Sequence, residues 1–465
     1  DAQWNMFSDS AEHGSEGIKL QEFIQGSTNI DLAWAVTKGD PGIVVAILDN
    51  GLESNTNIAS QANQKYNFVE NKIHVKDGSD DCVDNQECNG THVAGIVAAK
   101  GSTVYGVGPH LKIIVAKILA DDNTDVPQGA FADNVLDAMR WAAGDTSISR
   151  PSLPTVTTPA RVINLNVGTK TPAACDPFFQ ATVDLLRNTY NATVVIAAGN
   201  QGAQVKNYAL GNCKNVITVG ASDRGNKGTT YTNYDNAKEV WDRGNNLSFF
   251  MSVAAPGEEI YSTGGVVEEI DDAFNHLSGT AQAAAHVAGV AALLLSIDNT
   301  LTTDQLKNII ECTASPFHAE LDDGDKCKFP NYCGRGVVNA HAAVLAVQAG
   351  YKTVMCFPVK SINLRTGFGP HYQCDEGRAI PEHHIITGTH GIWKTNKGLI
   401  EPPFNNRPIK EICVPKQGFL SPAILDNGTI TATFGNIEYK LEPQPGYTCS
   451  VLTDTNGAIG CKTTI

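Results

Sequence analysis

Three polar residues that could take part in chemistry stand where a regular element would begin or end. Asp49 ends an apolar run that starts at Ile43, and Asn200 follows an apolar run that starts at Val195, so both should project from the end of a strand. His92 lies near the start of a helical pattern. A carboxylate can orient a base, an imidazole can transfer a proton, and a side-chain amide can donate a hydrogen bond to a developing oxyanion.

A parallel sheet with helices on both faces would bring such residues together. Five apolar runs show little alternation, which is typical of strands buried on both faces. They are Ile43–Asp49, Lys112–Leu119, Arg161–Val167, Thr193–Gly199 and Val216–Ser222. The helical patterns are Thr91–Lys100, Phe131–Ala143, Phe178–Tyr190, Thr280–Ser296 and Thr303–Cys312. This alternation predicts a doubly wound α/β domain, in which sites lie at the carboxyl ends of the strands.

The chain divides into three segments of different character. Residues 1–29 predict an irregular N-terminal arm, and residues 30–350 predict the α/β domain. After Gly350 the helical periodicity disappears, and Thr429–Phe434 and Ile437–Glu442 flank Gly435-Asn436, which is a hairpin signal. Five of the 12 cysteines lie in residues 351–465, so we expect a disulfide-rich, all-β C-terminal domain there.

The composition excludes several classes of function. Asp and Glu number 49 against 34 Lys and Arg, and the resulting charge of −15 argues against nucleic acid or an anionic membrane surface as a partner. The longest nearly apolar run, Val287–Ile297, is about half of what a bilayer-spanning helix needs, so we expect no membrane span. Scattered cysteines indicate disulfides and an oxidising compartment, hence a secreted or periplasmic protein. The chain begins with Asp1 and no leader, and we expect a processed product.

Four segments, in this order, resemble the motifs of the subtilisin-like serine proteases, or subtilases. They are Ile43–Gly51, Asn89–Gly95, Val195–Asn200 and Gly279–Gly289. In the family these segments carry the catalytic Asp, the catalytic His, the oxyanion Asn and the nucleophilic Ser. At those positions this sequence has Asp49, Asn89, Asn200 and Ala281. The resemblance covers about Ile30 to Ala349 and implies a subtilisin-like fold in a secreted bacterial protein.

The resemblance implies the fold of a serine protease without its chemistry. Such an enzyme needs a hydroxyl nucleophile, an imidazole base and a carboxylate that orients the base. Asp49 retains the carboxylate, but the Asn89 amide has no basic lone pair and Ala281 has no hydroxyl. In subtilisin, loss of either Ser or His lowers kcat by about 2 × 10⁶. We therefore expect a pseudoprotease without peptidase activity.

Neighbouring residues are not expected to replace the missing groups. Thr280 lies one residue round the helix start from Ala281 and should point elsewhere. His92 lies one helical turn after Asn89, where the family also carries a His, so a packed, hydrogen-bonded side chain is the favoured interpretation. The same interpretation applies to His286.

Further departures from the family motifs favour natural loss of catalysis over an engineered one. Gln282 stands where the family has Met, Ala285 where it has Pro, and Asn166-Val167-Gly168 where its substrate-pairing strand has Ser-Leu-Gly. The retained Asn200 and the Asn166–Gly168 strand could still hold an extended peptide, so we expect a protein or peptide partner. The first alternative is an active serine endopeptidase inactivated by mutation at positions 89 and 281. The second is an adhesin-like structural protein that acts through its C-terminal domain.

The cysteines predict three disulfides. Cys82 and Cys88 enclose five residues, so their bond would stabilise by only about 2 kcal/mol while tethering the segment before Asn89. The resemblance to extracellular bacterial subtilases implies the pairs Cys175–Cys213 and Cys312–Cys333. The pairing of Cys327 and of the five C-terminal cysteines stays open.

No cofactor is expected from the residues themselves, although the resemblance allows calcium because subtilases often bind it. Two oxygen-rich clusters could serve, namely Asp121, Asp122, Asp125 and Asp322, Asp323, Asp325. Neither matches a calcium-loop pattern, so solvated acidic loops are the favoured interpretation. Four histidines, His371, His383, His384 and His390, lack metal-ligand spacing and are interpreted as surface residues.

Overall fold

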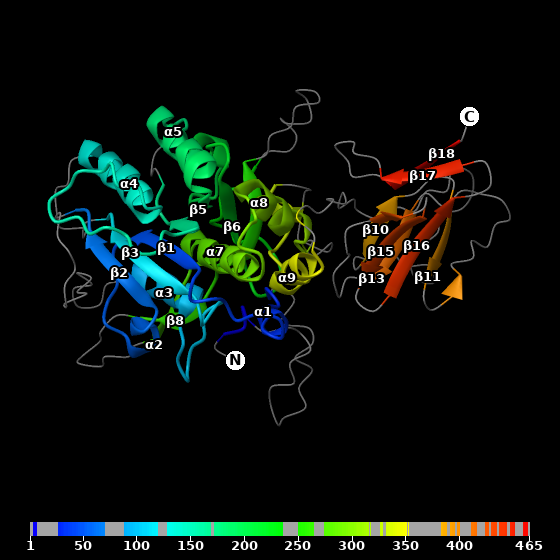
Figure 1. The fold of residues 1–465 in the computed structure, drawn as a ribbon, viewed down its shortest axis with the longest axis horizontal. Helices are drawn as coiled ribbons and strands as arrows, with labels where there is room; N and C mark the ends of the chain where they lie inside the picture. Colours follow the sequence, from blue (N-terminus) through cyan, green and yellow to red (C-terminus); the bar gives the residue numbers. More distant parts are fainter. Residues whose placement is uncertain are drawn as a thin grey trace.

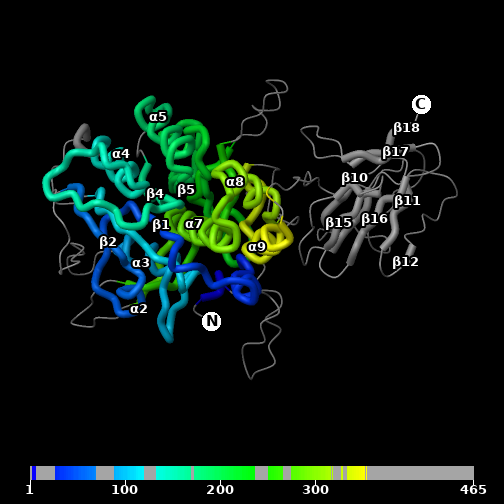
Figure 2. Tube along the Cα trace, in the orientation of Figure 1, coloured from blue at the N-terminus to red at the C-terminus, as the bar shows by residue number. Residues whose placement is uncertain are grey.

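The apolar runs form a seven-stranded sheet in which every pairing is parallel. A computed structural model describes residues 3–6, 27–69, 88–119, 128–168, 172–235, 250–264, 274–315, 317, 326–328, 332–350 and 352, and the backbone of the C-terminal strands (Figure 2). The strand order is β2-β3-β1-β4-β5-β6-β7. The strands are β1 (Val44–Asp49), β2 (Ala62–Asn67), β3 (Lys112–Lys117), β4 (Val162–Leu165), β5 (Thr193–Ala197), β6 (Ile217–Ser222) and β7 (Met251–Pro256).

Helices cover both faces of this sheet (Figure 1). On β1, Val45 and Ile47 face the core cluster that contains α3 (Asn89–Ala98) and α7 (Thr280–Ile297). The alternate residues of β1 face the cluster that contains α4 (Gln128–Ala142) and α5 (Pro177–Leu185). Because both faces are buried, the strands carry apolar residues at successive positions. The predicted doubly wound α/β fold is confirmed.

The described part of the chain holds further, mostly shorter helices. They are α1 (Ile30–Ala33), α2 (Thr56–Ala59), the π-helical turn η2 (Leu186–Tyr190), η3 (Val205–Asn207), α8 (Thr303–Cys312), η4 (Lys326–Lys328) and α9 (Ala340–Gln348). Helix α8 begins at a capping box in which Thr302 and Gln305 satisfy each other's backbone N–H groups. Helix α5 begins at Asp176, which accepts hydrogen bonds from the first turn and precedes a proline.

Residues 3–6, which belong to the predicted irregular arm 1–29, form a turn that packs on the domain core, and the bounds of the arm stay a prediction. Trp4 and Met6 are buried in the cluster around α7. The Asn5 side chain is buried as well, and its Nδ2 lies 2.7 Å from His286 Nε2. Among the described helices, α7 has the length and apolarity of a membrane span, but most of it is buried in this core.

Strands β8 (Ile260–Thr263) and β9 (Phe274–Leu277) form an antiparallel pair that precedes α7 in the chain.

The C-terminal strands pair in an antiparallel manner, as expected for an all-β region. The C-terminal strands are β10 (His383–Thr387), β11 (Gly391–Thr395), β12 (Gly398–Leu399), β13 (Glu411–Pro415), β14 (Ile424–Asp426), β15 (Thr429–Phe434), β16 (Ile437–Pro443), β17 (Tyr447–Val451) and β18 (Ile459–Thr463). Strands β15 and β16 form the predicted hairpin around Gly435-Asn436. The domain boundaries and the C-terminal disulfides stay predictions.

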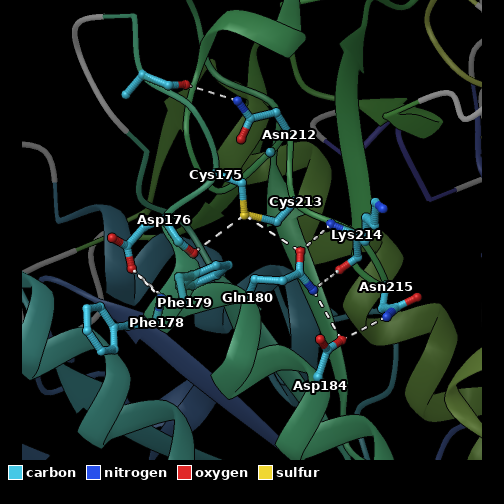
Figure 3. The surroundings of a disulfide bond; sticks show 12 residues. Cys175, Asp176, Phe178, Phe179, Gln180, Asp184, Asn212, Cys213, Lys214 and Asn215 are labelled. Carbon is cyan, nitrogen blue, oxygen red and sulfur yellow. Dashed lines mark hydrogen bonds between the residues drawn. A yellow bond between two sulfur atoms is a disulfide. The ribbon is translucent and has the colours of Figure 1, made fainter.

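The Cys175–Cys213 disulfide has the pairing that the family resemblance implies. Figure 3 shows that Gln180 of α5 strengthens the same connection, because its side chain accepts a hydrogen bond from Lys214 N (2.8 Å) and donates one to Lys214 O (3.1 Å). The bond and the amide together tie the segment after Gly168 to the start of β6.

The predicted Cys312–Cys333 pair is wrong. Cys333 is bonded to Cys327, six positions earlier, and their Cα atoms lie 5.1 Å apart, within the range for a disulfide. Cys312 is also disulfide-bonded, with another partner. Cys88 is disulfide-bonded too, but Cys82 lies outside the described residues, so the Cys82–Cys88 pair stays a prediction.

Candidate active site

Segments far apart in the sequence meet at the carboxyl end of the central strands. Asp49 is the last residue of β1, Asn166 follows β4, and Asn200 follows the end of β5. Asn89 is the first residue of α3, and Ala281 lies in the first turn of α7. Helix α3 can approach β1 this closely because Gly90 has no side chain, since a Cβ there would lie 2.2 Å from the carbonyl oxygen of Gly51.

The Asp49 carboxylate is fully buried and accepts three hydrogen bonds. Its Oδ2 accepts from Asn166 Nδ2 at 2.9 Å and from Asn89 Nδ2 at 2.8 Å, and its Oδ1 accepts from the backbone N–H of Asn50 at 2.8 Å. Burial raises the pKa of Asp49, and these three hydrogen bonds, that of Asn166 first, oppose the rise. Asp49 therefore binds two side-chain amides and one backbone N–H.

The Asn89 amide extends this network to α7. Its Oδ1 accepts a hydrogen bond from Gln282 Nε2 at 2.7 Å. Asp49 accepts from both side-chain amides, so the NH₂ group of Asn89 must face Asp49 and its oxygen must face Gln282. The side-chain oxygen of Asn89 thus already accepts a hydrogen bond from Gln282.

Asn200 is exposed and is oriented by the first residue of α7. Its Oδ1 accepts from Thr280 N at 3.0 Å and from Thr280 Oγ1 at 2.9 Å. The Thr280 hydroxyl also accepts from Gly199 N at 3.1 Å. A backbone N–H can only donate, so the amide orientation is fixed and Asn200 Nδ2 points away from Thr280. The Thr280 hydroxyl is thus engaged with Asn200 and Gly199.

Ala281 is half-buried in the first turn of α7 and offers a methyl group where the family has a hydroxyl. His92 is buried with Nε2 2.8 Å from the Ile260 carbonyl, and burial lowers its pKa to about 4. His286 is buried with Nδ1 2.8 Å from the Gln282 carbonyl, and burial lowers its pKa to about 4 as well. Both are packed, neutral core histidines, as predicted.

The Asn166–Gly168 segment follows β4 and leaves the sheet. Val167 is buried in the core cluster beside α5, whereas Gly168 is exposed. The backbone N–H and C=O of Gly168 form no hydrogen bond with the described part of the chain.

Metal ligands do not gather in the part of the chain that the structure describes, where no group of three or more His, Cys, Asp or Glu could hold an ion. The two acidic clusters near residues 121–125 and 322–325 lie outside the described residues. The side chains of the C-terminal histidines lie outside them too. The calcium expectation therefore stays a prediction.

Comparison with known proteins decides the family. The model of the subtilase family, peptidase family S8, matches residues 40–339. The chain belongs to the subtilase family. The predicted family resemblance is thereby confirmed over the domain that contains Asp49, Asn89, Asn200 and Ala281.

Relatives of this subtilase include secreted bacterial proteases. It is 30% identical to the "extracellular basic protease" of Dichelobacter nodosus over 83% of this chain and 61% of that protein. It is 29% identical to the "extracellular protease" of Xanthomonas campestris over 71% of this chain and 56% of that protein. The chain thus spans little more than half the length of these relatives. A solved protease from Pseudoalteromonas arctica PAMC 21717 is 28% identical with a TM-score of 0.56, covering 69% of this chain and 94% of that one.

Two features of the site could not be found from the sequence. Gln282 and Asn89 are 193 positions apart, and their hydrogen bond gave no local signal. In the sequence, Gln282 stands out only as a departure from the family's Met. The bond from the Asn166 side chain to Asp49 is an addition to the substrate-pairing role expected for the Asn166–Gly168 segment, and that role stays a prediction. An amide at both departing positions was the one available signal, since amides pair with carboxylates and with each other.

Proposed function

We propose that this subtilase is a secreted pseudoprotease that binds an extended peptide segment and does not hydrolyse it. The observation that carries this proposal is the amide network Asn166–Asp49–Asn89–Gln282, which occupies the place of a catalytic carboxylate and imidazole. Ala281, at the start of the same helix, contributes no nucleophile.

Nothing in this network can act as a general base toward a substrate. An amide oxygen is not basic near neutral pH, and that of Asn89 already accepts from Gln282. The Asp49 carboxylate is the one basic group of the network, but it is fully buried and holds three donors. The network therefore offers no exposed base that could activate a water molecule beside it.

Peptide binding is supported by groups that remain available. The exposed Gly168 can donate its N–H and offer its carbonyl oxygen to an extended chain. Asn200 Nδ2, held by Thr280, can donate to a carbonyl oxygen of that chain. Gly168 and Asn200 both follow strands of the sheet, and Asn200 is also held by α7. Peptide binding would therefore cost little conformational entropy of these two segments.

Secretion is proposed from the relatives and from the cysteines. The relatives named above are described as extracellular, and disulfides form in oxidising compartments. A bacterial origin is proposed on the same basis.

A matched pair of variants tests the binding proposal. Peptides that bind the immobilised full chain are selected from a random display library, and their affinity is measured by fluorescence anisotropy. Gly168→Pro removes the N–H donor, whereas Gly168→Ala keeps it, because a Cβ there would lie 3.8 Å from the nearest atom. We expect about tenfold weaker binding to Gly168→Pro and little change for Gly168→Ala. No selected peptide, or equal binding to both variants, would refute the proposal.

A further inference from the structure

Two side-chain amide groups beside Gly279, one from α7 and one from the segment after β5, have an end without a partner among the described residues. Gln282 Oε1 and Asn200 Nδ2 form no hydrogen bond with those residues, although the other end of each amide is bonded. Gln282 is 2% exposed. Its oxygen is therefore an almost buried acceptor that the described part of the chain leaves without a donor.

The backbone of Gly279 defines the space between the two groups. A Cβ at Gly279 would lie 2.8 Å from Gln282 Oε1 and 3.3 Å from Asn200 Nδ2. Real Cβ atoms do not approach an oxygen so closely, so a side chain here would displace Gln282. Glycine at this position therefore lets both atoms lie close to the Gly279 backbone, with an acceptor on one side and a donor on the other.

The hydrogen bonds of Asp49, Asn89 and Thr280 determine which end of each amide, oxygen or NH₂, faces Gly279. The Asp49 carboxylate accepts from the NH₂ group of Asn89, so the oxygen of Asn89 faces Gln282. That oxygen accepts from the NH₂ group of Gln282. The oxygen of Gln282 therefore faces Gly279. On the other side, Thr280 holds the oxygen of Asn200 and leaves its NH₂ group free. The family's Met at position 282 would provide no such acceptor.

We propose that Gln282 Oε1 and Asn200 Nδ2 together recognise the backbone N–H and C=O of one extended residue of a bound peptide. The N–H and C=O of a residue in a β-strand lie on the same edge of the chain, so a neighbouring acceptor and donor can engage both. Gln282 thereby selects for a ligand with a backbone N–H at this one position. This inference rests on the proposed function and adds Gln282 as a residue that determines which peptides bind.

An ester scan of a selected peptide tests the inference. Each backbone N–H is replaced in turn by an ester oxygen, and the affinity of each product for the full chain is measured by fluorescence anisotropy. At one position we expect about tenfold weaker binding, because the ester loses the bond to Gln282 Oε1 and places an oxygen against it. In Gln282→Met the amide and the ester at this position should bind within about twofold of each other.

Two further variants separate recognition from general damage. Asn200→Ala should weaken the amide and the ester alike and preserve their ratio, because Asn200 contacts the carbonyl oxygen. Asn299→Ala is the control: Asn299 is exposed and lies beyond the C-terminal end of α7, so its replacement should change the affinity of neither the amide nor the ester. A peptide that depends on Gly168 but gives a flat ester scan, or a scan that Gln282→Met leaves unchanged, would overturn this inference while leaving the proposed function intact. The absence of any Gly168-dependent peptide would overturn both.

Discussion

Restoring the family's base and nucleophile should reveal what Gln282 does to the site. In the double variant Asn89→His/Ala281→Ser, the introduced imidazole would donate one ring N–H to Asp49, which accepts from Asn89 at 2.8 Å in the native chain. Its other ring nitrogen would meet Gln282 Nε2, which donates to Asn89 Oδ1 at 2.7 Å. That nitrogen is the one that must take the proton of the introduced hydroxyl. We therefore expect a weakly active double variant.

Adding Gln282→Met should free the imidazole and raise the rate. A neutral hydrogen bond contributes about 0.5–1.5 kcal/mol, so releasing it should increase kcat/KM by about threefold to tenfold over the double variant. The assay is hydrolysis of a chromogenic peptide between pH 5 and 9, where activity should rise as the imidazole loses its proton. Ala281→Ser alone is the control and should stay inactive, because Asn89 offers no base.

The test compares kcat/KM of the triple variant Asn89→His/Ala281→Ser/Gln282→Met with that of the double variant. If the triple variant is no faster than the double variant, Gln282 does not compete for the base and the described network is not what occupies the site. If Ala281→Ser alone hydrolyses the peptide, a base other than position 89 is present, and the structural reasoning about Asp49 and Asn89 is wrong.

Two stability predictions follow from buried polar groups. Asp235 is 4% exposed, and burial raises its pKa to about 6. The folded state therefore binds the proton of Asp235 more tightly than the unfolded state does. The stability that this protonated carboxyl contributes is lost as the pH rises from about 4 to 6. Urea unfolding should show Asp235→Asn gaining about 3 kcal/mol relative to the native chain between pH 4 and pH 7, and a constant difference would contradict this. Asn5→Ala should lower the free energy of unfolding by about 1–3 kcal/mol, because it leaves the buried Nε2 of His286 without its donor; a loss below about 0.5 kcal/mol in the same assay would count against that hydrogen bond.

The central strands could be predicted because burial on both faces makes them apolar throughout. Strand β2 escaped prediction because it is an edge strand whose residues, Ala62–Asn67, are mostly polar and half-exposed. Strand β7 escaped because Met251–Pro256 holds a single β-branched residue and ends in proline. In both cases the position in the sheet, which the local sequence does not encode, decides the structure.

The site was predictable in its positions but not in its contacts. Strand ends and helix starts placed Asp49, Asn89 and Asn200 correctly at one edge, because parallel strands bring their carboxyl ends together. The contact of Gln282 with Asn89 depends on how α7 packs beside α3. Such contacts between distant segments follow from the packing of whole elements.

The measurement that tests the central claim most directly is proteolysis by the purified chain with this sequence. Fluorescein-labelled casein and a serine-directed phosphonate probe are offered to the chain, with a subtilisin as the positive control. The account predicts casein turnover indistinguishable from buffer and no covalent labelling of the chain. Casein cleavage that the phosphonate abolishes would contradict it.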